Sequence, residues 1–252
     1  MTQPLSSPVA VVTGAGAARV GNCVARALAD HGYRLAIHAN RSLSGATSTA
    51  EELTTAGSES IAVAADLSDE RQVTEMFETV LDRFGQIDAL VNCAAIYEAT
   101  SLEDVTAEDV RRHFDANTLG TFLCCQQAGK AMVRQTSGGA IVNLGDWATV
   151  RPYADYSAYF ASKGAIPTLT RCFAVELARR NPRVRVNAIL PGPVLFPEDL
   201  PEAERRVALA NTLVKHEGSP ENVAHAVLFL LQNDYVTGVC LPVDGGRSVY
   251  SE

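Results

Sequence analysis

The sequence predicts an α/β protein built on a doubly wound parallel sheet, in a single domain spanning residues 1–252. Short apolar, β-branched runs alternate with longer helical patterns from one end of the chain to the other. The runs are continuously apolar, which is typical of parallel strands covered by helices on both faces. A glycine-rich segment directly follows the first run, where such a fold makes a tight turn into its first helix.

Seven strands and six helices are expected. The strands are the apolar runs at 8–13, 33–39, 60–66, 88–94, 139–145, 184–190 and 239–244. The helices lie at about 20–31, 44–56, 69–84, 107–135, 157–180 and 220–232. The last helix has the clearest start, because Ser219 can cap it and Pro220 suits its first position. Pro167 falls inside helix 157–180 and should distort it just after Lys163, because a proline removes one helical hydrogen bond.

One segment interrupts the alternation. Residues 191–204 read PGPVLFPEDLPEAE and are rich in proline and acidic residues. We expect a loop over the ligand crevice, part of a substrate loop near 191–215, because ligand-binding residues are often carried on long loops.

The composition excludes several classes of protein. Apolar residues make up 47% of the 252 residues and charged residues 20%, as in an ordinary globular domain. The formal net charge of −8 argues against a general affinity for nucleic acid or an anionic membrane. The six cysteines form no CxxC pair, so neither a metal site nor a disulfide framework is expected. With no apolar stretch of about 18 residues and no signal-peptide pattern, we expect a cytoplasmic protein that acts on a small molecule.

The glycine-rich segment, TGAGAARVG at 13–21, predicts a nucleotide site. Glycine is needed where the backbone turns tightly or approaches a phosphate, and the following helix offers free N–H groups to a pyrophosphate. A plain tight turn is the alternative. Arg19 in this segment either lies beside the phosphates or the substrate mouth, or is simply exposed at the start of the helix.

The end of the second strand favours NADP(H) as the cofactor. Folds that bind NAD place a carboxylate here for the ribose 2′-hydroxyl, whereas folds that bind NADP place an arginine. The segment 37–42 reads IHANRS and has no carboxylate. A 2′-phosphate would contact Arg41 and Ser42, with Asn40 and His38 as further contacts.

A candidate reaction site follows the fifth strand. Tyr159 and Lys163 are spaced four residues apart, so they share one face of a helix. A phenol is a poor acid at neutral pH until a neighbouring cation stabilises its phenolate, and Lys163 supplies that cation. Asp146 stands at the end of the fifth strand, where ligands bind in open α/β sheets. Asn117 is a polar residue within helix 107–135 that needs a hydrogen-bonding partner.

Taken in order, these motifs resemble those of the short-chain dehydrogenase/reductases, over essentially the whole chain. The segments that carry the resemblance are TGAGAARVG, Asp66-Leu67, LVNCAA (90–95), NTLG (117–120), YFASK (159–163), VNAILPG (186–192) and VDGG (243–246). The resemblance implies a Rossmann-type fold, a nicotinamide cofactor and hydride transfer to or from a carbonyl or imine. It also implies a homotetramer formed through helices 107–135 and 157–180.

The resemblance further implies roles for individual residues. Tyr159 would be the catalytic acid, Lys163 its helper and a ligand of the ribose, and Asn117 the holder of a proton-relay water. The cofactor would be lined by Gly14, Arg19, Val20, Asp66, Leu67, Asn92, Ala94, Pro191, Gly192 and Val194. Asp66 and Leu67 would contact its adenine, and the last three residues would face its nicotinamide.

Three departures from the family pattern resemble one subfamily, the pteridine reductases. They are the turn Arg19-Val20-Gly21, the motif His38-x-x-Arg41-Ser42 and Asp146 at the position of the usual serine. This subfamily implies NADPH-dependent reduction of a pterin or dihydropterin, with Asp146 handling a proton and Tyr97 or Trp147 stacking on the ring. Two alternatives are an NADPH-dependent reductase of ketones or 3-oxoacyl thioesters, and a non-catalytic NADP-binding regulator.

Overall fold

The computed structural model describes residues 7–196 and 200–249. Its seven strands form one sheet in the order β3-β2-β1-β4-β5-β6-β7, and every neighbouring pair is parallel. The strands are β1 (Val9–Thr13), β2 (Arg34–Ala39), β3 (Ser60–Ala64), β4 (Ala89–Asn92), β5 (Gly139–Leu144), β6 (Val184–Pro191) and β7 (Cys240–Val243). This order confirms the predicted doubly wound sheet, and its direction reverses between β1 and β4.

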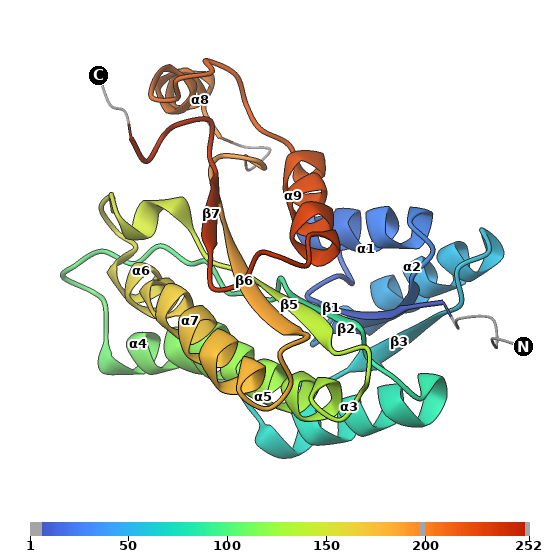
Figure 1. Cartoon of the computed structure of the whole chain (residues 1–252). Coiled ribbons are helices and arrows are strands. Elements are labelled where there is room, and N and C mark those ends of the chain that lie inside the picture. Colours follow the sequence, from blue (N-terminus) through green and yellow to red (C-terminus); the bar gives the residue numbers. More distant parts are fainter. Residues whose placement is uncertain (1–6, 197–199, 250–252) are drawn as a thin grey trace, which may run out of the picture.

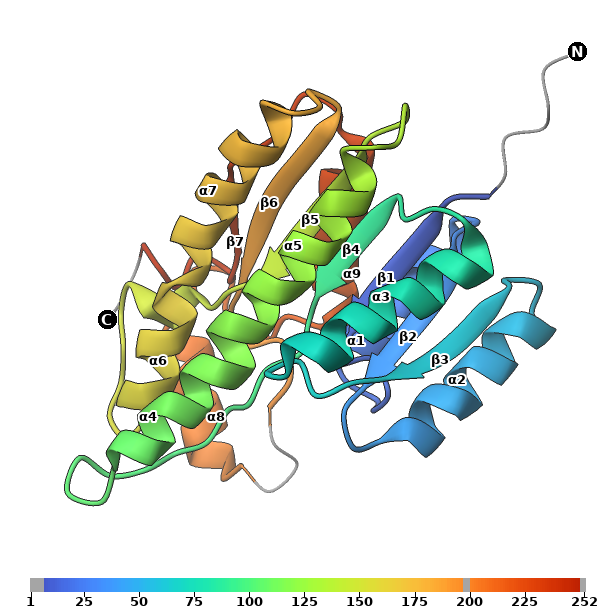
Figure 2. The same ribbon diagram turned by 90° about the horizontal axis from the view of Figure 1, so that it is seen from below.

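Helices cover both faces of the sheet (Figures 1 and 2). They are α1 (Val20–Asp30), α2 (Leu43–Thr55), α3 (Glu70–Phe84), α4 (Ala107–His113), α5 (Gly120–Met132), α6 (Ser157–Gly164), α7 (Ile166–Ala178), α8 (Glu202–Ala210) and α9 (Pro220–Gln232). One hydrophobic core joins the sheet to α1, α2 and α9, and a second joins it to α3, α5 and α7. Alternate residues of β1 contribute to the two cores, Ala10 and Val12 to one and Val9 and Val11 to the other.

Helix α9 begins as predicted. Ser219 is its N-cap and Pro220 opens the helix. The Ser219 N–H donates to Asn222 Oδ1 at 2.8 Å, which satisfies one of the backbone groups that a helix start leaves open.

The expected helix over 107–135 is present as one helical run that ends at Met132, but a π-helical turn interrupts its regular α-helix. Helix α4 ends at His113, a π-helical turn η1 follows at Phe114–Leu119, and α5 begins at Gly120. Asn117 lies in this turn, and its amide is bonded to the backbone of Ile96 and to Ser162. These bonds to two other segments hold the turn in its wider form. Turns of this kind are often found at functional positions.

The expected helix over 157–180 is two helices. Helix α6 ends at Gly164, α7 begins at Ile166, and Pro167 stands in the first turn of α7. A proline is tolerated in a first turn because the N–H that it lacks has no helical acceptor there. The predicted distortion just after Lys163 is confirmed.

The expected loop near 191–215 contains a helix. Helix α8 occupies Glu202–Ala210 within it, while residues 197–199 lie outside the described part of the chain. The segment EAERRVALA consists largely of good helix formers. Helix α8 buries none of its residues and follows a proline-rich stretch, which is why the segment was expected to be a loop.

Candidate active site

Three of the four predicted catalytic residues meet at the carboxyl end of β5. Asp146 follows this strand, and α6 carries Tyr159 and Lys163 past it. The Tyr159 hydroxyl donates to Asp146 Oδ2 at 2.8 Å. The Lys163 ammonium donates at 2.7 Å to the carbonyl of Leu144, which is the last residue of β5. A phenol, a carboxyl group and an ammonium therefore share one buried corner of the sheet edge.

Asn117, the fourth predicted catalytic residue, supports these three side chains through hydrogen bonds to neighbouring segments. Its Oδ1 accepts from the Ile96 N–H at 2.8 Å, and its Nδ2 donates to the Ile96 carbonyl and to Ser162 Oγ. Ser162 Oγ donates in turn to the Tyr159 carbonyl at 2.7 Å. Both amide hydrogens are thus used within the protein, so Asn117 fixes the backbone that carries Tyr159. Ser162, which the sequence analysis did not single out, completes this link from within YFASK.

Burial shifts the pKa values of the three reactive groups. It raises the pKa of Tyr159, and the neighbouring Asp146 carboxylate raises it further. Burial also raises the pKa of Asp146, against the opposing effects of the Ala148 N–H, the Tyr159 hydroxyl and the Lys163 charge. It lowers the pKa of Lys163 to about 8, partly offset by the attraction of Asp146. Tyr159 therefore holds its proton at neutral pH.

The two predicted stacking residues have different surroundings. Trp147 is buried, and the Arg247 guanidinium lies 4.7 Å from its ring centroid. Tyr97 is 49% exposed and contacts Tyr159 edge to face at a centroid distance of 4.8 Å. Tyr97 is therefore the aromatic ring that borders the reaction site. Tyr153 and Tyr156 also lie here and were missed, although the run YADYSAYF at 153–160 is visibly rich in aromatic residues.

The glycine-rich turn has the shape that a pyrophosphate requires. Gly14 has a φ of +66°, and a Cβ there would lie 2.7 Å from Ala94 Cα. A Cβ on Gly21 would lie 2.6 Å from the Gly14 carbonyl oxygen. The turn also packs on α2, since a Cβ on Gly45 would lie 2.1 Å from the Gly16 carbonyl oxygen. Arg19 occupies the N-cap position of α1 without a side-chain capping bond, and the first N–H groups of the helix begin at Val20. The turn fits the phosphates of a dinucleotide.

The four residues expected at a 2′-phosphate differ in their exposure at the end of β2. Asn40, Arg41 and Ser42 are consecutive and exposed. His38 is buried: its Nδ1 accepts from the Gly14 N–H at 3.1 Å, and its Nε2 lies 3.0 Å from the Ala65 carbonyl. Because both ring nitrogens are used, His38 positions the glycine-rich turn and has no nitrogen for the phosphate contact that we expected.

The other expected cofactor residues follow the ends of neighbouring strands. Asp66 accepts from Ser68, which lowers the pKa of its carboxyl group, and Leu67 is buried against Gly120. The Asn92 side chain points into the protein and donates to Asn143 Oδ1 at 2.9 Å. The remaining members are Ala94, whose N–H donates to Thr13 Oγ1, and Pro191, Gly192 and Val194 at the end of β6.

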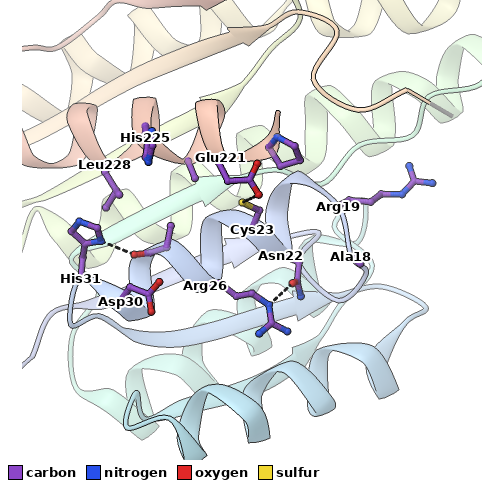
Figure 3. Close-up of a pocket in the computed structure, with 13 residues that line it drawn as sticks. Ala18, Arg19, Asn22, Cys23, Arg26, Asp30, His31, Glu221, His225 and Leu228 are labelled. Carbon is purple, nitrogen blue, oxygen red and sulfur yellow. Dashed lines mark hydrogen bonds between the residues drawn. The ribbon is translucent and has the colours of Figure 1, made fainter. Parts of the chain in front are cut away.

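A separate groove of about 510 Å³ lies between α1 and α9 (Figure 3). Cys23 and Glu221 face each other across it, with the thiol 3.6 Å from the carboxylate oxygen. Arg19 stands at one end. None of the four predicted catalytic residues lines this groove, so it is distinct from the reaction corner on α6.

The fold and this corner define a short-chain dehydrogenase/reductase, and the chain belongs to that family. Residues 14–248 match a family profile described as enoyl-(acyl carrier protein) reductase. The chain is 36% identical over 233 residues to human 3-oxoacyl-[acyl-carrier-protein] reductase, covering 92% of this chain and 94% of the human protein. It is 36% identical over 241 residues to carbonyl reductase family member 4 of Danio rerio, covering 95% and 98%.

A solved structure gives the same result. A Sinorhizobium meliloti 1021 protein described as a short-chain alcohol dehydrogenase superposes with a TM-score of 0.89 at 29% identity, covering 98% of each chain. The protein is therefore an oxidoreductase of a family that uses NAD(P)H. Within residues 7–196 and 200–249, no helix is long and apolar enough to cross a membrane.

Proposed function

We propose that this protein is an NADPH-dependent carbonyl reductase that acts on a ketone or a 3-oxoacyl compound. The observation that carries the proposal is the protonated, buried Tyr159 hydroxyl, bonded to Asp146 and followed by the buried Lys163 ammonium. Similarity to a 3-oxoacyl reductase and to a carbonyl reductase supports this substrate class.

In the proposed reaction, the reduced nicotinamide supplies a hydride when it is bound. Tyr159 donates its proton to the carbonyl oxygen as negative charge develops there. Lys163 stabilises the phenolate that remains, because its positive charge acts in a buried site. The Leu144 carbonyl keeps the Lys163 ammonium in place. Asn117, acting through Ser162, keeps the backbone of Tyr159 in place. The Tyr159 hydroxyl, which donates to Asp146 Oδ2 in this structure, would turn from that carboxyl group to the substrate oxygen to deliver its proton.

The preference for NADPH rests on the end of β2. Arg41 and Ser42 are exposed beside the glycine-rich turn, and no carboxylate follows β2 to bind a ribose 2′-hydroxyl. A guanidinium binds a phosphate through paired, charge-assisted hydrogen bonds. Asp66 lies close enough for Arg41 to lower the pKa of its carboxyl group.

Reduction of a pterin is the second candidate. Asp146 favours it, because a carboxylate can accept hydrogen bonds from the amino and N–H groups of such a ring. The named relatives give no support to a pteridine reductase, and Arg247 covers the ring of Trp147, one of the two expected stacking residues. We therefore place carbonyl reduction first.

The test is NADPH consumption with a simple ketone, a 3-oxoacyl thioester and a dihydropterin. Turnover of the ketone or thioester supports the proposal, turnover of the dihydropterin alone supports the second candidate, and tight NADPH binding without turnover indicates a regulator.

Tyr159→Phe should lower kcat by about 10²–10⁴-fold, because only the proton donor is lost. Its NADPH dissociation constant should stay close to that of the wild type. Tyr235→Phe, at a phenol that is 97% exposed, is the matched control. A loss below about tenfold would contradict the role of Tyr159.

We also propose a homotetramer, formed through the segments 107–135 and 157–180. Exposed apolar side chains on α5 and α7, among them Phe122 and Val175, support it.

A further inference from the structure

Three tyrosines form a wall beside the catalytic phenol. The phenol wall consists of Tyr97, Tyr153 and Tyr156. Tyr97 follows β4, and the other two lie between Trp147 and α6. None of them takes part in the proton transfer that we propose for Tyr159, so the wall needs a separate explanation.

The rings of the wall contact one another in specific orientations. Tyr97 stacks on Tyr156 with centroids 4.5 Å apart and planes 15° apart. Tyr153 meets Tyr156 edge to face at 5.3 Å. Tyr97 also meets the reactive Tyr159 edge to face at 4.8 Å. The wall therefore reaches directly to the group that donates the proton.

Hydrogen bonds fix the two segments of the wall to each other. The Tyr97 and Tyr153 hydroxyls lie 3.0 Å apart, and the Thr100 N–H donates to the Asp155 carbonyl at 2.7 Å. Because the wall is tied at two points, its ring planes stay in place when a ligand binds. The entropy lost in ordering these side chains on binding is therefore smaller.

The wall nevertheless stays open to solvent. Tyr97 is 49% exposed and Tyr153 is 43% exposed, whereas Tyr159 beside them is buried. Half-exposed aromatic rings next to a reactive group form a binding surface for a molecule whose carbonyl reaches that group. Aromatic surfaces favour other flat rings beyond the effect of buried area alone.

We propose that the phenol wall selects flat, conjugated carbonyl compounds, such as aryl ketones, over saturated ketones of the same size. The proposal rests on the carbonyl reductase function and names its substrate class. Tyr97 provides the ring surface, and Tyr153 holds the Tyr97 ring in position through the contact between their two hydroxyl groups. Tyr97 and Tyr153 are thus specificity-determining residues.

The test compares acetophenone with cyclohexyl methyl ketone, which have the same carbon skeleton but a flat and a puckered ring. The wild type should have the higher kcat/KM for acetophenone. Tyr97→Leu, which keeps an apolar side chain but loses the ring, should reduce that ratio by about fivefold, mainly through the KM for acetophenone. Tyr97→Phe should retain most of the preference, and Tyr153→Phe should lose part of it because Tyr97 is no longer tied. Tyr235→Leu, far more exposed, is the control and should leave the ratio as in the wild type.

Binding provides a second readout that does not depend on turnover. The dissociation constants of both ketones are measured by calorimetry with NADP⁺ present, where no reduction takes place. Tighter binding of acetophenone that is lost in Tyr97→Leu supports the proposal even if neither ketone is reduced, in which case only the carbonyl reductase function fails. Equal dissociation constants in the wild type, or equal losses for both ketones in Tyr97→Leu, overturn it and leave the wall as a shield for Tyr159.

Discussion

At the scale of single residues, the burial of Lys163 carries an electrostatic cost. Its side chain is 4% exposed, and burial lowers its pKa to about 8. At neutral pH the ammonium is therefore largely charged inside the protein, held by the Leu144 carbonyl and attracted by Asp146. A buried charge stabilises a developing phenolate strongly, but it reduces the stability of the fold.

This balance predicts how activity depends on pH. The kcat/KM for reduction should fall as the pH rises through about 8, because Lys163 loses the charge that stabilises the Tyr159 phenolate. Lys163→Met should be slow at every pH and should lack this decline. A decline of the same shape in the variant would assign it to another group.

The same pKa predicts how stability depends on pH. The Lys163 side chain has its ordinary pKa of 10.5 in the unfolded chain and a pKa of about 8 in the folded one, so the unfolded chain binds more protons between these values. The free energy of unfolding should therefore rise with pH across this window. Lys163→Met should be more stable than the wild type at pH 7, by on the order of 1–3 kcal/mol, and the difference should shrink towards pH 10. Urea unfolding at pH 7 and pH 10 measures both, and equal stabilities at pH 7 would contradict the cost of burial.

Arg41 is the residue whose loss should change the cofactor preference. Arg41→Ala should raise the KM for NADPH and leave that for NADH nearly unchanged, because only NADPH carries a 2′-phosphate. The expected loss is about 1.5–3 kcal/mol, as for hydrogen bonds to charged groups. Arg71→Ala, at another exposed arginine on α3, is the control. Equal KM values for the two cofactors in the wild type would refute the preference.

At the scale of elements, the contact between the glycine-rich turn and α2 shapes the expected phosphate site. Gly45→Ala would place a methyl group 2.1 Å from the Gly16 carbonyl oxygen, so the turn or the helix must move. We expect a rise in the NADPH dissociation constant of about tenfold or more, together with lower stability.

Gly164→Ala is the matched control for Gly45→Ala. Nothing lies within 4 Å of its added methyl group, so it should stabilise α6 by about 0.5–1 kcal/mol. Calorimetric titration and thermal unfolding compare the two variants. An unchanged cofactor affinity in Gly45→Ala would show that the turn tolerates displacement.

Elements with local signals were predicted from the sequence, and elements fixed by distant contacts were not. The strands, the glycine-rich turn, the start of α9 and the break at Pro167 all follow from nearby residues. The π-helical turn η1 does not, because Asn117 is held by Ile96 and Ser162, 21 and 45 residues away. Helix α8 was missed because it follows a stretch rich in proline, which favours a loop, and it buries no side chain.

The site follows the same division. Tyr159 and Lys163 were singled out from their helical spacing, and Asp146 from its place at a strand end, and the structure brings the three together. His38 was assigned to a phosphate from its neighbours in the sequence, yet its partners are Gly14 directly after β1 and Ala65 after β3. Tyr153 stands in a visibly aromatic run, but its place beside the site comes from its contact with the phenol of Tyr97, 56 residues away, which the sequence does not show.

At the scale of the whole molecule, one layer of helices carries an exposed apolar surface. Phe114 and Leu119 of η1, Phe122 of α5 and Val175 of α7 are all exposed. They lie on the side of the sheet covered by α3, α5 and α7 (Figure 2). Exposed apolar residues gathered on neighbouring helices are typical of an interface. Two copies meeting through this face give a dimer, and the tetramer that we propose needs a second face on each chain in addition.

Val175→Glu should disrupt this tetramer. Val175 is 60% exposed, so a glutamate there is tolerated in the single chain. In a symmetric interface the same substitution introduces a charge from each partner and forces both to lose water. Light scattering should report the mass of four 26.8 kDa chains for the wild type and a smaller species for the variant. Leu43→Glu, at the start of α2, is the control. It should fold normally because an acidic residue suits a first helical turn, and it should remain tetrameric because α2 lies on the other layer of helices. A wild type that is monomeric at micromolar concentration, or a Val175→Glu variant of unchanged mass, would show that this surface does not join copies of the chain.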